Sequence, residues 1–65
     1  MNVTPAERRV LDLLVEGRTN KEIASALWLT TETIKFHVTN LLRKNGARNR
    51  AHLAAMAIRE ERAAL

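Results

Sequence analysis

Apolar residues along this chain recur at spacings of three and four, which is the period of an amphipathic α-helix. Four segments show this pattern, and each is bounded by residues that favour the start or the end of a helix. They predict helices over residues 5–16, 20–27, 31–45 and 50–62. The expected fold is therefore all-α, a compact four-helix bundle, with residues 1–65 forming one domain.

Capping signals mark the ends of these segments. Thr4–Glu7 and Thr19–Glu22 both fit the capping box, in which a threonine hydroxyl and a glutamate three residues later satisfy the first amide groups of a helix. Gly17 and Gly46 suit the left-handed conformation that ends many helices, and Asn49 suits the cap of the last one.

The second and third predicted helices are separated only by Trp28–Thr30, a spacing that predicts a helix-turn-helix. Such turns often contain glycine, and this one does not. We expect Leu29 to fill the core beneath the turn and Thr30 to cap the helix that follows.

The third predicted helix has two faces of different character. One face is apolar and would hold the helix against its own domain; its residues are Ile34, Val38 and Leu41. On the opposite face Phe36 lies between polar residues, and a large apolar side chain at a solvent-facing position needs a reason. The DNA major groove is wide enough to admit an α-helix. We therefore expect Lys35, Phe36 and Thr39 to contact DNA bases.

A helix placed in this way would bring other residues beside the phosphate backbone. The start of the third helix offers hydroxyl and amide groups where the helix dipole favours an anion, and basic side chains lie on either side of it. The residues predicted to contact phosphate are Lys21, Thr30, Thr31, Thr33, His37, Arg43, Lys44, Arg48 and Arg50.

The distribution of charge is compatible with such a role. The formal net charge is +4, and no acidic residue occurs between Glu32 and Glu60. A basic stretch of this kind suits a surface that faces a polyanion. A solvated basic face without a ligand is the simpler explanation, and charge alone does not decide between the two.

The residues form no recognisable catalytic constellation. Ser25 is the only serine and has no histidine near it in the sequence, while His37 and His52 lack metal-ligand partners at helical spacing. We expect no enzyme activity, no metal and no cofactor. No apolar run approaches the roughly 18 residues of a membrane span, so we expect a cytoplasmic protein without a membrane partner.

These features together resemble the LuxR-type helix-turn-helix domain, which also occurs in NarL- and FixJ-type response regulators and in small GerE-like proteins. The most specific parts are Asn20–Ala24, with the sequence NKEIA, and Thr33–His37, with the sequence TIKFH. Other positions that fit are Thr4, Pro5, Glu7, Val10, Leu11, Leu14, Gly17, Leu27, Asn40, Lys44, Asn49 and Arg50. The resemblance implies a four-helix, DNA-binding transcriptional effector domain that dimerises through its fourth helix. It also implies base contacts from Lys35, Phe36 and Thr39.

Two positions depart from the family pattern, which usually has leucine at Asn45 and valine at Ala47. Asn45 falls on the apolar face of its helix, where an unpaired amide would cost about 1–3 kcal/mol. Alternatively, Asn45 beside Gly46 ends the helix with its amide partly solvated. The sequence leaves both explanations open, and both predict weaker packing between the third and fourth helices.

The fourth predicted helix has two apolar stripes, and the second of them suggests a partner. We expect the core to receive Ala51, Ala54, Ala55 and Ile58. The residues then left for a dimer interface are Leu53, Met56, Ala57 and Ala64. A weak homodimer would set two recognition helices roughly 34 Å apart and require an inverted-repeat site.

The leading hypothesis is a transcription regulator that binds double-stranded DNA at specific sequences, with RNA polymerase as a further partner. The alternative is a helical protein-interaction module whose basic face meets an acidic protein. The sequence does not reveal the operator, the sign of regulation or the upstream signal. It also leaves open whether residues 1–65 are the effector part of a longer regulator or a stand-alone GerE-like protein.

Overall fold

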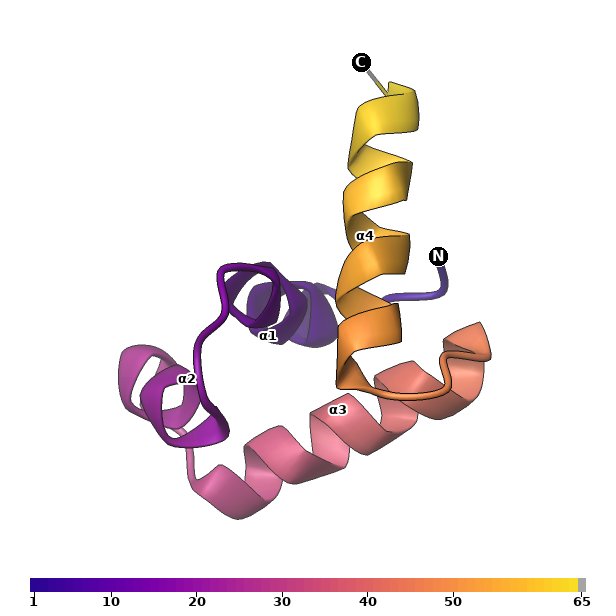
Figure 1. Cartoon of the computed structure of the whole chain (residues 1–65). Helices are drawn as coiled ribbons and strands as arrows, with labels where there is room; N and C mark the ends of the chain where they lie inside the picture. Colours follow the sequence, from indigo (N-terminus) through magenta and orange to yellow (C-terminus); the bar gives the residue numbers. More distant parts are fainter. Residues whose placement is uncertain (65) are drawn as a thin grey trace.

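The computed structural model describes residues 1–64, which form four helices joined by short connections (Figure 1). These helices are α1 (Pro5–Val15), α2 (Asn20–Leu27), α3 (Thr31–Asn45) and α4 (Arg50–Ala64). No strand occurs in the described residues, so the predicted all-α fold is confirmed. Helices α2 and α3 have the predicted bounds, whereas α1 ends one residue earlier and α4 continues two residues further.

The predicted caps are present. The Thr4 hydroxyl accepts a hydrogen bond from the Glu7 amide at 3.1 Å, and the Glu7 carboxylate accepts one from the Thr4 amide at 2.9 Å. Thr19–Glu22 repeats this arrangement with distances of 3.1 and 2.8 Å. At the start of α4 the Asn49 side chain accepts a hydrogen bond from the His52 amide at 2.8 Å. Local hydrogen bonding therefore fixes where three helices begin.

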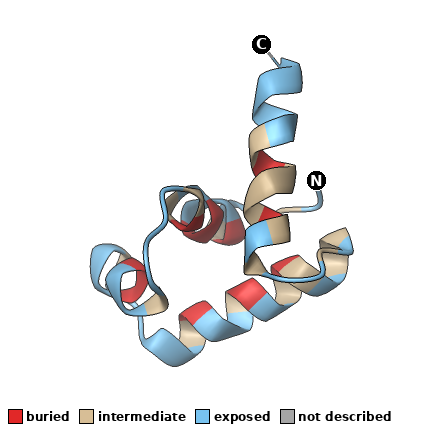
Figure 2. Ribbon diagram, in the orientation of Figure 1, coloured by how far each residue is buried: buried red, intermediate tan, exposed pale blue. Residues whose placement is uncertain are grey.

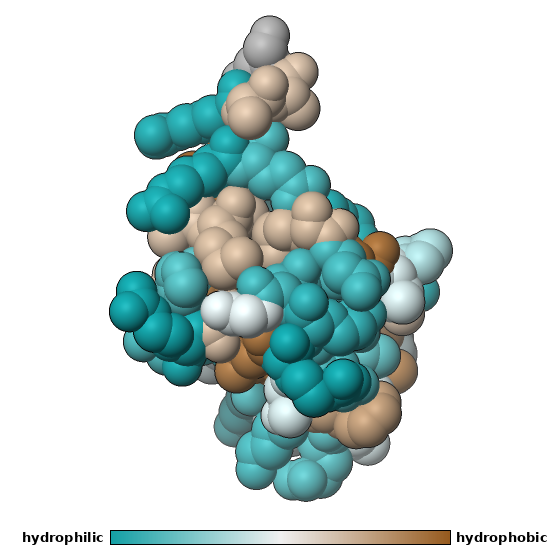
Figure 3. Space-filling view, turned by 90° about the vertical axis from the view of Figure 1, so that its right-hand side faces the viewer, coloured by the Kyte–Doolittle hydropathy of each residue, from teal (hydrophilic) through white to brown (hydrophobic). Residues whose placement is uncertain are grey.

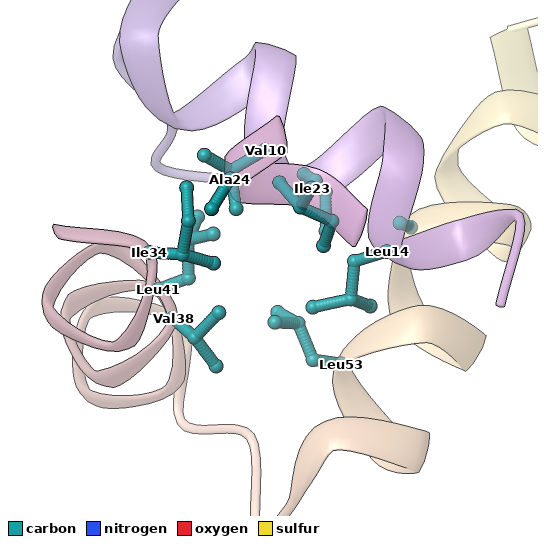
Figure 4. Close-up of a cluster of buried hydrophobic side chains, with 10 residues drawn as sticks. Val10, Leu14, Ile23, Ala24, Ile34, Val38, Leu41 and Leu53 are labelled. Atoms are coloured by element: carbon teal, nitrogen blue, oxygen red, sulfur yellow. The ribbon is translucent and has the colours of Figure 1, made fainter. Parts of the chain in front are cut away.

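The core lies where the four helices meet, and its side chains point toward one another (Figure 4). Each helix buries one face and leaves the opposite face in solvent (Figure 2). Three residues of α3 belong to the core, so the rotation of this helix about its axis is fixed. The buried apolar residues are Val10, Leu11, Leu14, Ile23, Ala24, Ile34, Val38, Leu41, Leu53 and Ala57.

Helix α4 buries two of the four residues that the sequence analysis assigned to a dimer interface, while Met56 is half-buried and Ala64 is exposed. Leu53 is fully buried and Ala57 is 9% exposed, so the prediction that they form a dimer interface is wrong. The first turns of α4 supply one large side chain to the core, and Leu53 has that place. Ile58, which we expected in the core, lies about 140° around the helix from Leu53. It is half-buried, and Ala51 on the same side is exposed.

The turn between α2 and α3 differs from the prediction as well. Leu29 is 43% exposed and does not fill the core beneath the turn. Leu27, the last residue of α2, packs against the core instead. Trp28 adopts the left-handed conformation, with φ 59° and ψ 39°, at the position where such turns often have glycine. The chain therefore reverses at Trp28 and carries Leu29 outward.

Candidate nucleic-acid interface

The face of α3 that points away from the core carries the three residues predicted to contact bases. Ile34 and Leu41 are fully buried on the inner face, which turns Lys35, Phe36 and Thr39 outward. Phe36 is 63% exposed although it is aromatic. The outer side of α3 is unobstructed along the lower edge of the molecule in Figures 1 and 2. Its contact with DNA stays a prediction, but the required exposure is present.

Lys35 has a partner that the sequence analysis overlooked. Its ammonium lies 3.4 Å from the carboxylate of Glu32, one turn earlier in α3. Both side chains are largely exposed, and an ion pair in solvent contributes about 0–1 kcal/mol. A guanine base can therefore replace Glu32 as the partner of Lys35 at little cost. The three-residue spacing was the signal that could have identified this pair.

Phe36 is accompanied by the neighbouring His37. Their ring centroids lie 6.0 Å apart with an interplanar angle of 60°, an edge-on arrangement. His37 is half-buried, whereas Phe36 extends into solvent. The phenyl ring is therefore available to pack against an apolar group such as the methyl group of thymine.

The N-terminal end of α3 carries hydrogen-bond donors that have no partner within the helix. The Thr30 hydroxyl caps the helix by accepting a hydrogen bond from the Thr33 amide at 3.2 Å, and the two hydroxyl oxygens lie 2.9 Å apart. The first amides of any α-helix have no partner within the helix, and here Thr31 and Glu32 supply them. These amides, with the exposed side chains of Thr30 and Thr31, can donate to a phosphate oxygen.

Exposed basic residues in α2, in α3 and in the loop after α3 belong to the surface that is predicted to face DNA. Lys21, in the first turn of α2, is exposed, as are Arg43 and Arg48. The Arg43 guanidinium donates a hydrogen bond to the side chain of Asn40 at 3.3 Å, which orients it along α3. Asn40 is a second residue that the sequence analysis did not include in the site.

Lys44 does not belong to this surface. Its ammonium forms an ion pair with the carboxylate of Glu7, and the two side chains are 19% and 6% exposed. Hydrogen bonding from Lys44, together with the Thr4 amide, lowers the pKa of Glu7 despite its burial. The prediction that Lys44 contacts phosphate is therefore withdrawn, because the side chain is occupied in joining the C-terminal part of α3 to α1.

Arg50 is also occupied inside the domain. Its guanidinium donates to the side chain of Asn20 and to the carbonyl oxygen of Arg18, both at 2.6 Å. These bonds join the start of α4 to the first residue of α2 and to the loop before it. Because both terminal nitrogens of the guanidinium are held by these bonds, we propose no phosphate contact for Arg50.

The departure at Asn45 has a structural explanation. Its amide nitrogen donates to the carbonyl oxygens of Leu41 at 2.9 Å and Asn2 at 3.1 Å, and its oxygen accepts from the Asn2 amide at 2.7 Å. Asn45 is therefore half-buried and fully bonded, and it fastens the segment before α1 to the end of α3. The explanation with an unpaired amide is wrong. Asn45 is the last residue of α3 before the left-handed Gly46, as the alternative explanation expected, and its partly exposed amide is hydrogen-bonded as well.

A groove away from α3 differs in charge from the face described above. A groove of about 610 Å³ lies between α1 and the C-terminal half of α4. Its charged lining is mainly acidic, which opposes the approach of DNA; these acidic residues are Asp12, Glu16, Glu60 and Glu61. Within the described residues, no group of three or more potential metal ligands is found, and no helix has the length and apolarity to cross a membrane.

Comparison with known proteins agrees with the geometry. The family model described as bacterial regulatory proteins, luxR family, matches residues 1–57. The transcriptional regulatory protein LiaR of Bacillus subtilis is 41% identical over 58 residues, which are 89% of this chain and 28% of LiaR. The spore germination protein GerE of the same organism is 37% identical over 57 residues, covering 88% of this chain and 77% of GerE. The DNA-binding transcriptional activator DevR/DosR of Mycobacterium tuberculosis is 44% identical over 55 residues, covering 85% of this chain and 25% of DevR/DosR.

Proposed function

Because the chain belongs to the luxR family of bacterial regulatory proteins, we propose that it binds double-stranded DNA at specific sequences and regulates transcription in the cytoplasm. The observation that carries this proposal is the outward face of α3, where Phe36 is 63% exposed between Lys35 and Thr39. The chain spans 28% of the length of LiaR and 77% of the length of GerE. Either a larger regulator or a small GerE-like protein is thus compatible with the proposal.

In this proposal α3 lies in the major groove and reads base edges directly. Lys35 leaves Glu32 and donates to O6 or N7 of guanine, Phe36 packs on a thymine methyl group, and Thr39 supplies a hydroxyl or a methyl group. A good bidentate contact, such as one from Lys35 to O6 and N7 of guanine, contributes about 1–3 kcal/mol of discrimination between bases.

Phosphate contacts hold the helix in register. The amides and hydroxyl groups at the start of α3 bind one phosphate, and cations on either side bind others. The residues proposed for this role are Lys21, Thr30, Thr31, Thr33, His37, Arg43 and Arg48. Release of counterions from the backbone makes this part of the affinity dependent on salt but not on sequence.

A weak homodimer through α4 forms a further part of the proposal. With Leu53 and Ala57 buried, the outer face with Ala51, Ala55 and Ile58 is the one that can meet a second copy. Figure 3 views the molecule from the side of α4 and shows weakly apolar atoms there between hydrophilic ones. Isologous packing would require an inverted-repeat site. RNA polymerase is a proposed further partner.

The alternative, a protein-interaction module with a basic face, has less support. The relatives LiaR and DevR/DosR are both named as proteins that act in transcription, and none of the features described above favours an acidic protein over DNA.

Selection of bound sequences from a random duplex pool, followed by measurement of variants, tests the proposal. Lys35→Ala should weaken binding to the selected site by about 1–3 kcal/mol and relax the base preference at one base pair. Arg48→Ala should weaken binding to all duplexes equally. It should also make the slope of log affinity against log salt concentration shallower by about one unit. Replacing thymine by deoxyuridine, which lacks the methyl group, should lower the affinity of the wild-type protein for the duplex. It should not lower the affinity of Phe36→Ala. Unchanged base preference in Lys35→Ala would show that another face reads DNA.

A further inference from the structure

Trp28 combines two unfavourable features in the free protein. It is the only tryptophan of the chain, and its side chain is 94% exposed, the highest value among the exposed large hydrophobic residues. Within the described residues it is also the only non-glycine residue with a positive φ. Its backbone amide is held by the carbonyl oxygens of Ala24 and Ser25, so the backbone is fixed while the indole ring stays outside the core.

The position of Trp28 relates it to the proposed DNA surface. It lies two residues before Thr30, which caps α3, and the turn is continuous with the end of α3 that would bind phosphate (Figure 1). The two acidic residues nearest in sequence lie outside the turn, in α2 and α3. Glu22 accepts a hydrogen bond from the Thr19 amide, and Glu32 pairs with Lys35. No acidic residue lies between Glu22 and Glu32, so the turn that carries the indole has no carboxylate of its own to repel a polyanion.

Resting on the proposed function, we infer that Trp28 contacts the sugar–phosphate backbone of duplex DNA beside the groove that α3 enters. The indole N–H is a donor that can bind a phosphate oxygen, while the ring can pack against deoxyribose. This contact is uncharged, so it displaces no counterion, and it touches no base edge. It therefore adds affinity for every sequence without steepening the salt dependence.

The contact can be separated from the turn conformation by substitution. Asparagine and glycine both tolerate the left-handed conformation, so Trp28→Asn and Trp28→Gly remove the indole and keep the turn. Both variants should bind duplexes about three- to tenfold more weakly, the range of one lost hydrogen bond, with an unchanged salt slope. Ser25 is exposed on α2 one turn earlier, so Ser25→Ala is the matched control. It should bind duplexes as tightly as wild type does.

Intrinsic fluorescence reports the contact directly because Trp28 is the sole tryptophan. Quenching by acrylamide, a neutral probe, should be efficient in the free protein and should fall when saturating duplex is added. The inference would be overturned if saturating duplex left the quenching unchanged and both variants bound as tightly as wild type. A protein partner would then be the better candidate for contact with the indole. If the two variants bound only the selected site more weakly, and other duplexes as wild type does, Trp28 would contact bases and not the backbone. If the wild-type chain binds no duplex, the proposed function fails and this inference fails with it.

Discussion

The ion pair between Glu7 and Lys44 connects the first turn of α1 to the end of α3, and its removal should destabilise the domain. In Glu7→Gln the amide oxygen can still accept the Thr4 amide, since glutamine also serves in a capping box. The negative charge is lost, however, and Lys44 remains with only 19% of its side chain exposed. The substitution therefore isolates the charge from the cap.

The expected magnitude follows from the burial of the two partners. Breaking a buried pair costs about 3–5 kcal/mol, whereas an exposed pair contributes about 0–1 kcal/mol. Glu7 is almost fully buried, but the Lys44 amine can turn toward solvent, so we expect a loss of about 2–3 kcal/mol. For a domain of this size, that lowers the melting temperature by about 10–20 °C. Total stability is itself only about 3–10 kcal/mol, so the effect is large.

The pH dependence gives an independent signature. Lys44 and the Thr4 amide lower the pKa of Glu7 from its ordinary value of 4.5. Because the folded-state pKa is below that of the unfolded chain, the stabilisation is fully present above the unfolded value and is lost as pH falls through the folded value. Glu7→Gln should therefore flatten the acid limb of the stability curve. Some dependence will remain, since the Thr19 amide lowers the pKa of Glu22 as well.

Urea unfolding of wild type, Glu7→Gln, Lys44→Met and the double variant, each between pH 3 and 7, measures these effects. The sum of the stability losses in the two single variants should exceed the loss in the double variant, because each single substitution removes the same ion pair. Lys44→Met should also keep the wild-type salt slope for DNA, unlike Arg48→Ala. Additive losses, or an acid limb unchanged in Glu7→Gln, would refute the coupling that the structure implies.

Three further substitutions test other parts of the account. Asn45→Leu should lower stability by about 1 kcal/mol, since it removes three hydrogen bonds for a modest gain in burial, and a higher melting temperature would contradict this. Trp28→Gly should raise stability by about 1 kcal/mol in urea unfolding, because Trp28 is a non-glycine residue in the left-handed conformation and its side chain is exposed. A loss of stability would show that the indole stabilises the turn. Ile58→Glu should keep the fold and abolish cooperative binding to a two-half-site duplex, whereas Leu53→Glu should unfold the domain; equal cooperativity in wild type and Ile58→Glu would exclude this face as the interface.

Local signals predicted the helices and the outward face of α3. Capping boxes and glycines act within a few residues, and the spacing of Ile34, Val38 and Leu41 determines which side of a long helix is buried. These interactions need no knowledge of distant parts of the chain, so the sequence alone was sufficient.

Most of the errors arose where the outcome depends on contacts between distant segments; the outward position of Leu29 and the pair of Glu32 with Lys35 are local exceptions. The two stripes of α4 are both rich in alanine, and only the space left by the other helices decides that Leu53 is buried. The partners of Lys44, Arg50 and Asn45 lie 30 or more residues away, at Glu7, Asn20 and Asn2 respectively, so no local pattern revealed them.

The most direct test of the proposed interface is a titration of the isotopically labelled protein with the selected duplex, followed by amide chemical shifts in NMR. The account predicts that the largest changes occur from Trp28 through Arg43, on the turn and the outer positions of α3. Amides lining the groove between α1 and α4, such as Asp12 and Glu61, should change little. Largest changes at that groove, with α3 unaffected, would contradict the assignment of α3 as the helix that binds DNA.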